Sequence, residues 1–515
     1  MGVTRAERLG VAWPALAVTA VSAASMALEI VAGRALAPYV GMSLYTWTVI
    51  IAVVLAGLSL GHWIGGRIAD ATRHPARAVA VALSGAAVTT LLCLAALRLA
   101  APLAAEAGPV PHVTALAMAA FFLPSALAGV VSPLLTVIAL AAAPEGRQGR
   151  VLGLMYALGA VGAILGTLAA GLLMISWLGT AGSVALIGLV YAALSLRFWR
   201  ARGAAVAGAV TAAVAAAAGS FPGALGLTTA CLRESPHFCI RVDDLAGVGR
   251  PARVMALDHL AHGVNDRDDP RLLLSPYVQG VDELVARRFG GPALSAFFVG
   301  GGAYTLPRAW QARYPAGEFL VAEIDPAVTE IAEARMWFEP GPHMEIRHGD
   351  ARRVLAGLAE DRRFDVIFGD AFHDISIPQH LVTDEFHALV ARRLKPGGVY
   401  VLNVVDALRE PRFMLSLART LELRFESVEL WMDRASIQPA EARATWIVLA
   451  SDRPTGADRI AAKTGFARDW VRVPLDAMVR AVGPEALVRL TDDYAPVARL
   501  LAPVLLDASL AEGGR

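Results

Sequence analysis

The sequence predicts an N-terminal α-helical bundle of about seven membrane spans and a C-terminal Rossmann-like α/β domain, with a small β element before it. Hydrophobic residues make up 56% of the 515 residues and charged residues only 18%, which is too apolar for a purely soluble enzyme. Polarity then changes sharply near residue 220, after which apolar runs alternate with helix-like segments. We therefore expect a transmembrane domain over 1–220, a linker with the β element over 221–290, and the Rossmann-like domain over 291–515.

Charge and cysteine content exclude several classes of protein. A formal net charge of +1 gives no indication of nucleic-acid binding. Three cysteines, Cys93, Cys231 and Cys239, are too few for a disulfide-dense scaffold or a Cys-rich zinc site, and no metal is expected. Cys231 and Cys239 are close enough in sequence to bridge if oxidised, while two separate buried thiols are the alternative.

Apolar segments in the first 220 residues are long enough to cross a lipid bilayer, whose core requires roughly 20 helical residues. Together they predict a multi-pass protein of the cell membrane. Glycines repeat every four residues in two of these segments, a spacing that allows close helix packing. Glu29 lies inside the first span with Arg34 near its end, which is either a functional carboxylate or a structural pair. The predicted spans are 12–35, 43–65, 78–101, 112–142, 151–177, 180–198 and 203–220.

Arginines favour one end of the predicted bundle, and the excess of positive charge normally faces the cytoplasm. The opposite loops hold little beyond Arg34 and Arg98. Seven spans would then place the C-terminal half outside the cytoplasm. The biased arginines are Arg5, Arg8, Arg67, Arg73, Arg77, Arg147, Arg150, Arg197, Arg200 and Arg202.

Strand and helix patterns alternate through the C-terminal half, which is typical of a doubly wound parallel sheet. The short runs "HFCIRV" and "ARVMAL" first indicate the small β element. Buried strands follow at "SAFFV", "EFLVAEI", "HMEIRHGD", "FDVIFGDAF" and "GGVYVLNVV". Helices are predicted between them, for example in "DPAVTEIAEARMWF", where Pro326 suits a first turn.

Ligands of such sheets bind at the carboxyl ends of the strands. A ribose can be held by an acid at the end of the second strand and an adenine amino group by an acid at the end of the third. "GGGAYT" lacks the G-x-G-x-x-G spacing of a dinucleotide site, and suits S-adenosylmethionine or a relative better. The candidates, in strand order, are Gly300, Gly301 and Gly302, then Glu323, then Asp350 with the adjacent Ala351, then Asp370.

Taken together, these pieces resemble the spermidine synthase (polyamine aminopropyltransferase) family, and most closely its membrane-fused branch. The pieces are "ESPHFCIRV", "ALDHLAH", "FFVGGG", "VAEIDP", "HGDAR", "FDVIFGDAF" and "LKPGG", with "LEIVAGRALAPYVG" and "GLSLGHWIGGRIAD" in the first spans. The resemblance covers about 235–450 and implies an S-adenosylmethionine-dependent type of fold. It implies that Glu323 holds the ribose, that Asp350 holds the adenine, and that Asp370 helps to deprotonate an attacking amine. Tyr277 resembles the family's substrate-gripping tyrosine.

Several positions depart from the family on the amine side. Ala303 and Tyr304 stand where the family's glycine loop continues with an acid. His373, followed by Asp374, replaces a second acid after the fourth strand, and His262 stands where soluble members carry Gln. The residues expected to bind adenosine are therefore intact, whereas those expected to recognise the amine are altered. The substrate-binding candidates are Tyr277, Tyr304, His262, His373 and Asp374.

The expected activity is transfer of an aminopropyl group from decarboxylated S-adenosylmethionine, or from S-adenosylmethionine itself, to a small-molecule amine such as putrescine. A methyltransferase or another S-adenosylmethionine-consuming enzyme is the first alternative, and a non-catalytic binding or transport protein is the second. A homodimer is compatible with this interpretation. The cosubstrate is made in the cytoplasm, so the expected chemistry favours a soluble domain on the cytoplasmic side. The arginine pattern favours the opposite side, and the side of the soluble domain stays open.

Overall fold

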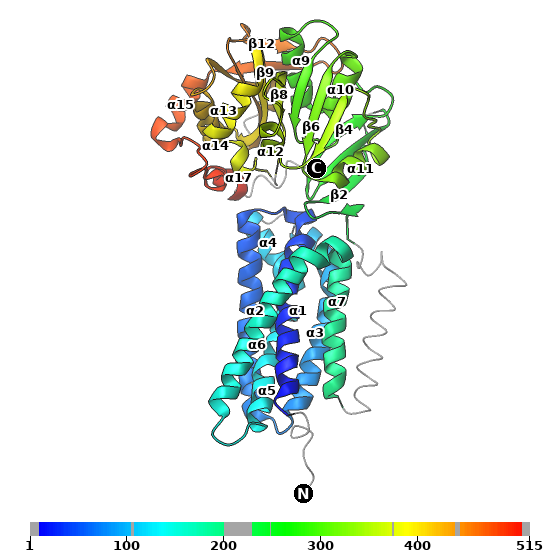
Figure 1. Ribbon diagram of the computed structural model, residues 1–515, viewed down its shortest axis with the longest axis vertical. Coiled ribbons are helices and arrows are strands. Elements are labelled where there is room, and N and C mark those ends of the chain that lie inside the picture. The colour runs from blue at the N-terminus through cyan, green and yellow to red at the C-terminus, as the bar shows by residue number, and fades with distance from the viewer. Residues whose placement is uncertain are drawn as a thin grey trace. The chain divides into compact units, whose positions relative to one another are not determined.

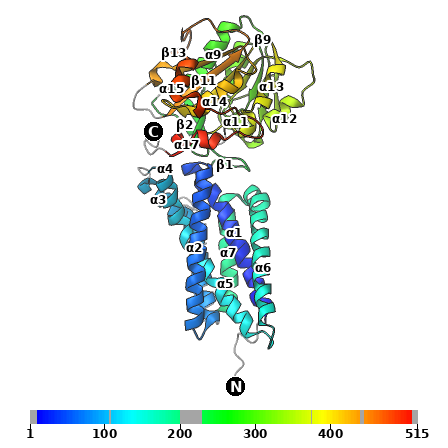
Figure 2. The ribbon, with the colours of Figure 1, turned by 90° about the vertical axis from the view of Figure 1, so that its left-hand side faces the viewer.

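The computed structural model describes residues 10–104, 108–199, 229–247, 249–372, 375–437 and 443–506 (Figures 1 and 2). The chain forms two compact units, Met1–Cys239 and Ile240–Arg515. The domain boundary predicted at 220 lies outside the described residues, and the predicted domain limits stay a prediction.

The first unit is a bundle of helices. Five of its helical stretches are long and apolar enough to cross a membrane: Ala12–Val40, Leu44–Ala71, Pro75–Ala104, Pro109–Ala141 and Gln148–Phe198. They comprise α1 (Ala12–Val40), α2 (Leu44–Ala71), α3 (Pro75–Ala104), α4 (Pro109–Ala117), η1 (Met118–Phe122), α5 (Leu123–Ala141), α6 (Gln148–Ala169), η2 (Ala170–Met174) and α7 (Ile175–Phe198).

The described residues thus hold five such stretches where seven spans were predicted. The first four predicted spans lie on α1, α2, α3 and the α4–α5 stretch. The fifth and sixth lie on one stretch, Gln148–Phe198, which is interrupted only at Gly179 (φ 67°, ψ −177°). The helical backbone is broken at this glycine and the chain turns back into α7 (Figure 1), so the two predicted segments are separate helices joined directly at Gly179. The seventh predicted span, 203–220, lies outside the described residues.

The glycine repeats bring helices into close contact, as predicted. A Cβ at Gly57, Gly61 or Gly65 of α2 would lie under 3.0 Å from backbone atoms of η1 and α5. Gly162 and Gly166 of α6 approach the backbone of α1 in the same way. Only glycine permits such approaches, and they supply the van der Waals contact that holds helices together in lipid.

Glu29 and Arg34 of α1 take different environments. Glu29 is 7% exposed, and its Oε2 has no hydrogen-bond partner within the described part of the chain. Arg34 donates instead to the carbonyl oxygens of Ser235 and His237, each at 2.9 Å. The contacts of Arg34 are therefore with the segment that follows the bundle.

The second unit is built on a nine-stranded sheet in the order β12-β13-β10-β11-β9-β8-β5-β6-β7. Its strands are β5 (Ser295–Val299), β6 (Glu318–Glu323), β7 (Met344–His348), β8 (Phe364–Gly369), β9 (Leu394–Ala407), β10 (Ser427–Asp433), β11 (Arg443–Ser451), β12 (Arg459–Ala461) and β13 (Asp469–Val473). A separate sheet contains β1 (Arg233–Glu234), β2 (Cys239–Asp244), β3 (Ala252–Leu257) and β4 (Leu260–Asp266).

The five predicted strands, β5 to β9, pair in parallel. The sheet as a whole is mixed, because β9 pairs antiparallel with β11, and β10 pairs antiparallel with both β11 and β13. The predicted doubly wound parallel sheet therefore accounts for β5 to β9 and not for the antiparallel strands β10 to β13. An antiparallel extension needs only short connections, and its strands carry no motif that distinguishes them from the parallel ones.

Helices cover both faces of this sheet. Ile447 of β11 lies against Gly280 of α9. The two neighbours of Ile447 in the strand, Trp446 and Val448, belong instead to a core cluster that includes residues of α14. The helices and helical turns of this unit are α9 (Pro276–Arg288), α10 (Thr305–Arg313), α11 (Pro326–Arg335), α12 (Ala351–Ala356), η3 (Gln379–Leu381), α13 (Asp384–Arg393), α14 (Arg412–Leu421), η4 (Arg434–Ser436), α15 (Leu475–Val482), η5 (Pro484–Ala486), α16 (Val497–Leu500) and α17 (Ala502–Leu506).

The strand order reverses next to β5. The chain passes from β5 to β6 and β7 on one side, and then returns to place β8 on the other side of β5. Such a switch point opens a crevice at the carboxyl ends of the two strands. The segments that follow β5 and β8 are therefore adjacent, and both carry predicted site residues.

Candidate functional site

The glycine loop follows β5 and contacts the end of β8. Gly300 has a φ of 96°, and a Cβ there would lie 2.8 Å from the carbonyl oxygen of Asp370. The Asp370 amide in turn donates to the Val299 carbonyl at 3.0 Å. Only glycine combines this backbone conformation with this approach. The predicted glycine loop and Asp370 thus lie side by side.

Glu323 ends β6 and faces the glycine loop. Its Oε2 accepts the amides of Gly301 (2.7 Å) and Gly302 (3.2 Å), and its Oε1 accepts the Asp325 amide at 2.9 Å. Burial raises the pKa of Glu323, and these backbone donors oppose that shift. Each carboxylate oxygen can accept two hydrogen bonds, so Oε1 retains capacity for a ligand hydroxyl.

Asp350 begins α12 and has two partners. Its Oδ1 accepts the Arg353 amide at 2.9 Å, which caps the helix. Its Oδ2 lies 2.6 Å from His380 Nε2 of η3. Ala351 follows in the first turn and is buried. Sequence reasoning missed His380, because a histidine thirty residues away carries no motif that ties it to Asp350.

Asp370 follows β8 and is held by two side chains. Asn403 Nδ2 of β9 donates to its Oδ1 at 2.8 Å, and the Tyr277 hydroxyl of α9 donates to its Oδ2 at 3.1 Å. Burial raises the pKa of Asp370 to about 6, although the two hydrogen bonds lower it. Burial, together with the charge of Asp370, raises the pKa of Tyr277 well above its usual value. Tyr277 therefore remains the donor, and Asp370 titrates close to neutral pH.

Asn403 is a second residue that sequence reasoning missed. It lies within "VLNVV", where its neighbours Val401, Leu402 and Val404 are buried and apolar. Asn403 is 4% exposed, and its Oδ1 has no hydrogen-bond partner in the part of the chain that the structure describes. A buried polar residue in a central strand usually has a specific partner, and that signal was present in the sequence.

His262 of β4 lies beside the same loop. A Cβ at Gly302 would be 3.4 Å from the His262 carbonyl oxygen, and the imidazole ring lies 6.5 Å from the ring of Phe372, edge to face. Burial lowers the pKa of His262 to about 4, so the ring is neutral at pH 7. Asn265, in the same strand, donates to the carbonyls of Ala303 and Met336 and so fixes β4 against the loop.

Tyr304 lies behind the glycine loop rather than in an open site. It is 0% exposed, its hydroxyl is 2.7 Å from Thr329 Oγ1, and its ring stacks on Phe338 at 4.2 Å. These contacts support a packing role and give no support to the predicted substrate contact. The other two amine-side candidates, His373 and Asp374, lie outside the described residues.

The described residues contain no group of three or more His, Cys, Asp or Glu side chains placed to hold a metal ion. What the structure brings together is the glycine loop, Glu323, Asp370, Tyr277 and His262. Asp350 lies two residues after the end of β7, on the same edge of the sheet and two strands from β5. This edge offers acceptors for hydroxyl and amino groups and one carboxylate suited to receive a proton.

Comparison with known proteins agrees with the resemblance found in the motifs. The chain is 34% identical over 140 residues to a polyamine aminopropyltransferase of Vibrio vulnificus, a match that covers 27% of this chain and 46% of that protein. It is 34% identical over 121 residues to a probable polyamine aminopropyl transferase of Bifidobacterium longum, which covers 24% of this chain and 26% of that protein. The chain is thus similar to polyamine aminopropyltransferases over part of their length, and these names say nothing of a membrane-fused part.

The chain therefore spans less than half the length of these curated relatives. No family model matches the sequence. Among solved structures, a probable spermidine synthase from Corynebacterium glutamicum is 22% identical with a TM-score of 0.41, and the match covers 50% of this chain and 94% of that one.

Proposed function

We propose that this spermidine synthase-like chain is a multi-pass enzyme of the cell membrane that transfers an aminopropyl group to a small amine such as putrescine. The donor is decarboxylated S-adenosylmethionine, and methylthioadenosine is released. The observation that carries the proposal is Asp370, a half-buried carboxylate with a raised pKa, held by Tyr277 and Asn403 next to the glycine loop. Five long apolar helices support the membrane location.

The donor would bind along the loop and the two acids beside it. Glu323 would accept hydrogen bonds from the ribose hydroxyls, and Asp350 would accept one from the adenine amino group, with the Ala351 amide beside it. Gly300, Gly301 and Gly302 leave room for the nucleoside to approach the backbone. The sulfonium carbon would then lie near Asp370, because the loop contacts the end of β8.

The transfer itself is a displacement at carbon. The amine nitrogen donates its lone pair to the carbon next to the sulfonium, the C–S bond breaks, and its electron pair returns to sulfur, which becomes neutral. The nucleophile must be uncharged, and removing a proton from an alkylammonium of pKa ~10.4 costs about 4–5 kcal/mol at pH 7. Asp370 accepts that proton, and a positioned base of this kind contributes roughly 10²- to 10⁴-fold in rate.

Tyr277 has two roles in this scheme. Its hydroxyl orients the Asp370 carboxylate, and its ring offers an electron-rich face that attracts a cation. His262, neutral at pH 7, offers the acceptor a hydrogen-bonding partner without a charge.

A second candidate function, methyl transfer from S-adenosylmethionine, is favoured by Ala303. The resemblance places an acid at this position to contact the donor's amino group. The Ala303 Cβ lies only 2.6 Å from the place that a Cβ on Gly263 would occupy, so residue 303 packs on β4. Without that acid, the donor pocket has lost a feature that identifies the decarboxylated compound.

The test is product analysis with purified full-length protein in lipid nanodiscs. Each donor is incubated with a panel of amines, and products are identified by mass. Methylthioadenosine with an aminopropylated amine supports the proposal, whereas adenosylhomocysteine supports methyl transfer. If Asp370→Asn forms product as fast as the wild type, Asp370 is not the base. Binding of adenosyl compounds without any product would indicate a non-catalytic binding protein.

A further inference from the structure

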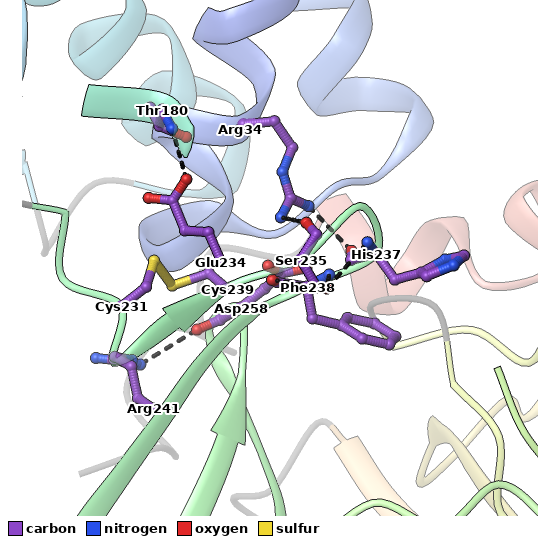
Figure 3. The surroundings of a disulfide bond; sticks show 10 residues. All are labelled: Arg34, Thr180, Cys231, Glu234, Ser235, His237, Phe238, Cys239, Arg241 and Asp258. Carbon is purple, nitrogen blue, oxygen red and sulfur yellow. Dashed lines mark hydrogen bonds between the residues drawn. A yellow bond between two sulfur atoms is a disulfide. The ribbon is translucent and has the colours of Figure 1, made fainter. Parts of the chain in front are cut away.

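A disulfide-closed loop connects the bundle to the sheet unit. Cys231 and Cys239 form a disulfide bond that spans eight positions of sequence (Figure 3). The open question of bridged or separate thiols is thereby answered for these two residues. Cys93, the remaining cysteine, is a free and buried thiol in α3.

The loop is fixed to one end of the bundle by polar contacts within the first unit. Arg34 donates to the carbonyls of Ser235 and His237, and the Thr180 amide donates to Glu234 Oε2 at 2.6 Å (Figure 3). Thr180 begins the helical segment after the break at Gly179, so a carboxylate at its N-terminus is favourable. A small cavity at this end is lined by Arg34, Arg98, Thr180, Cys231 and Glu234.

The directions of α1, α6 and α7 show at which end of the bundle the loop 231–239 is held. The sites of close approach pair Gly162 with Thr19 and Gly166 with Ala23, so α6 runs parallel to α1 and away from the N-terminus. The chain therefore reaches Gly179 at the end where α1 carries Arg34. It returns along α7, so Phe198 lies at the end where α1 begins (Figures 1 and 2).

The arginine-rich connections lie at that other end. The α2–α3 connection carries Arg73, with Arg67 and Arg77 in the flanking helices, and Arg147 precedes α6. By the positive-inside rule this end faces the cytoplasm. The loop 231–239 is held at the opposite end, and Ile240, the first residue of the sheet unit, follows it directly in the chain.

From these two independent observations we infer that the spermidine synthase-like unit lies on the outer face of the cytoplasmic membrane. Disulfide bonds persist in oxidising compartments and are rare in the cytoplasm, so the bond agrees with the arginine distribution. The sheet unit takes its amine and its adenosyl compound from the outer side. The inference rests on the membrane insertion in the proposed function, but not on the proposed catalysis.

Reporter fusions test the side directly. Two reporters are fused, one at a time, after Arg515 of the full chain. Alkaline phosphatase is active only outside the cytoplasm. Green fluorescent protein that is exported unfolded does not fluoresce, so its fluorescence reports a cytoplasmic location. We expect active phosphatase and no fluorescence. The matched control inserts each reporter after Arg147, in the connection between α5 and α6, and should give the opposite pair. Fluorescence with inactive phosphatase at the C-terminus would overturn the inference.

Thiol counting tests the disulfide without any activity assay. Cells are acid-quenched and denatured, and free thiols are labelled with a polyethylene glycol maleimide. The wild type should carry one label, on Cys93, before reduction and three after it. Cys231→Ser should carry two labels without reduction. Three labels on the unreduced wild type would overturn the inference. A protein that passes both tests and forms no product would contradict only the proposed function.

Discussion

Glu323 is buried and Asp370 is half-buried, and both carboxylates lie at one edge of the sheet, but different kinds of hydrogen-bond donor hold them. Three backbone amides, all within 22 residues of Glu323, bind its oxygens. Two side chains bind Asp370, from Tyr277 of α9 and Asn403 of β9. The donor-binding acid is thus positioned by a local strand–loop geometry. The proposed base is positioned by elements that only the folded sheet brings together, and its proton affinity can be changed by substituting either partner.

Replacing the base should have the largest effect on activity. We expect Asp370→Asn to lower the turnover rate roughly 10²- to 10⁴-fold, since the amide cannot accept the proton that the carboxylate would take. Mass analysis of product formation under saturating substrate measures this loss.

The same substitution should remove a pH dependence of stability. Burial raises the pKa of Asp370 from 3.8 to about 6, so the folded protein binds the proton more tightly than the unfolded chain. This contribution to folding is complete below about pH 4 and is lost as the pH rises to about 6. The Asn variant should therefore lack that decline in thermal unfolding temperature. A variant that is inactive and also unstable at every pH would instead indicate a structural role.

Glu323→Gln should weaken donor binding by about one to two orders of magnitude. A hydrogen bond to a charged group contributes roughly 1.5–3 kcal/mol, and the neutral amide also places an NH₂ group toward the amides of Gly301 and Gly302. Calorimetry with methylthioadenosine measures the affinity independently of turnover. Unchanged affinity would mean that the acid organises the loop without touching the ligand. Glu330→Gln, on α11, is the control for loss of a carboxylate.

Asn403→Ala should change the pH profile more than the maximum rate. The amide lowers the pKa of Asp370, so its removal should move the acidic limb of the rate profile to higher pH. We expect a loss of up to about tenfold at pH 7 that is recovered at higher pH. A uniform loss at every pH would contradict this positioning role.

Tyr304→Phe should have the smallest effect, because the Tyr304 hydroxyl bonds to Thr329 inside the fold. Loss of one buried hydrogen bond costs roughly 1 kcal/mol, which a thermal unfolding measurement detects. The Michaelis constant for the amine should not change. Tyr277→Phe is the matched control, because it removes a hydroxyl that contacts Asp370. If the Tyr304→Phe variant instead has a raised Michaelis constant for the amine, then Tyr304 contacts the substrate, as predicted from the sequence.

Much of the architecture could be predicted because it repeats along the chain. Apolar length predicted the helices of the bundle, and the alternation of strands and helices predicted β5 to β9 in parallel. The sequence did not separate the antiparallel strands β10 to β13 from further parallel strands, because the direction of pairing depends on the connection and the packing rather than on the strand itself. It also did not show that the fifth and sixth predicted spans join directly at Gly179.

The sequence by itself determined which residues end the parallel strands, because the glycine loop and the acids follow apolar runs in a fixed order. Only the tertiary structure decided that Tyr277 and Asn403 both bind Asp370, that Tyr304 is packed behind the loop, and that Cys231 is bonded to Cys239. The physical reason is that local patterns specify periodicity and chain reversal, whereas hydrogen bonds between distant elements and the burial that raises the pKa of Asp370 exist only after the sheet has formed.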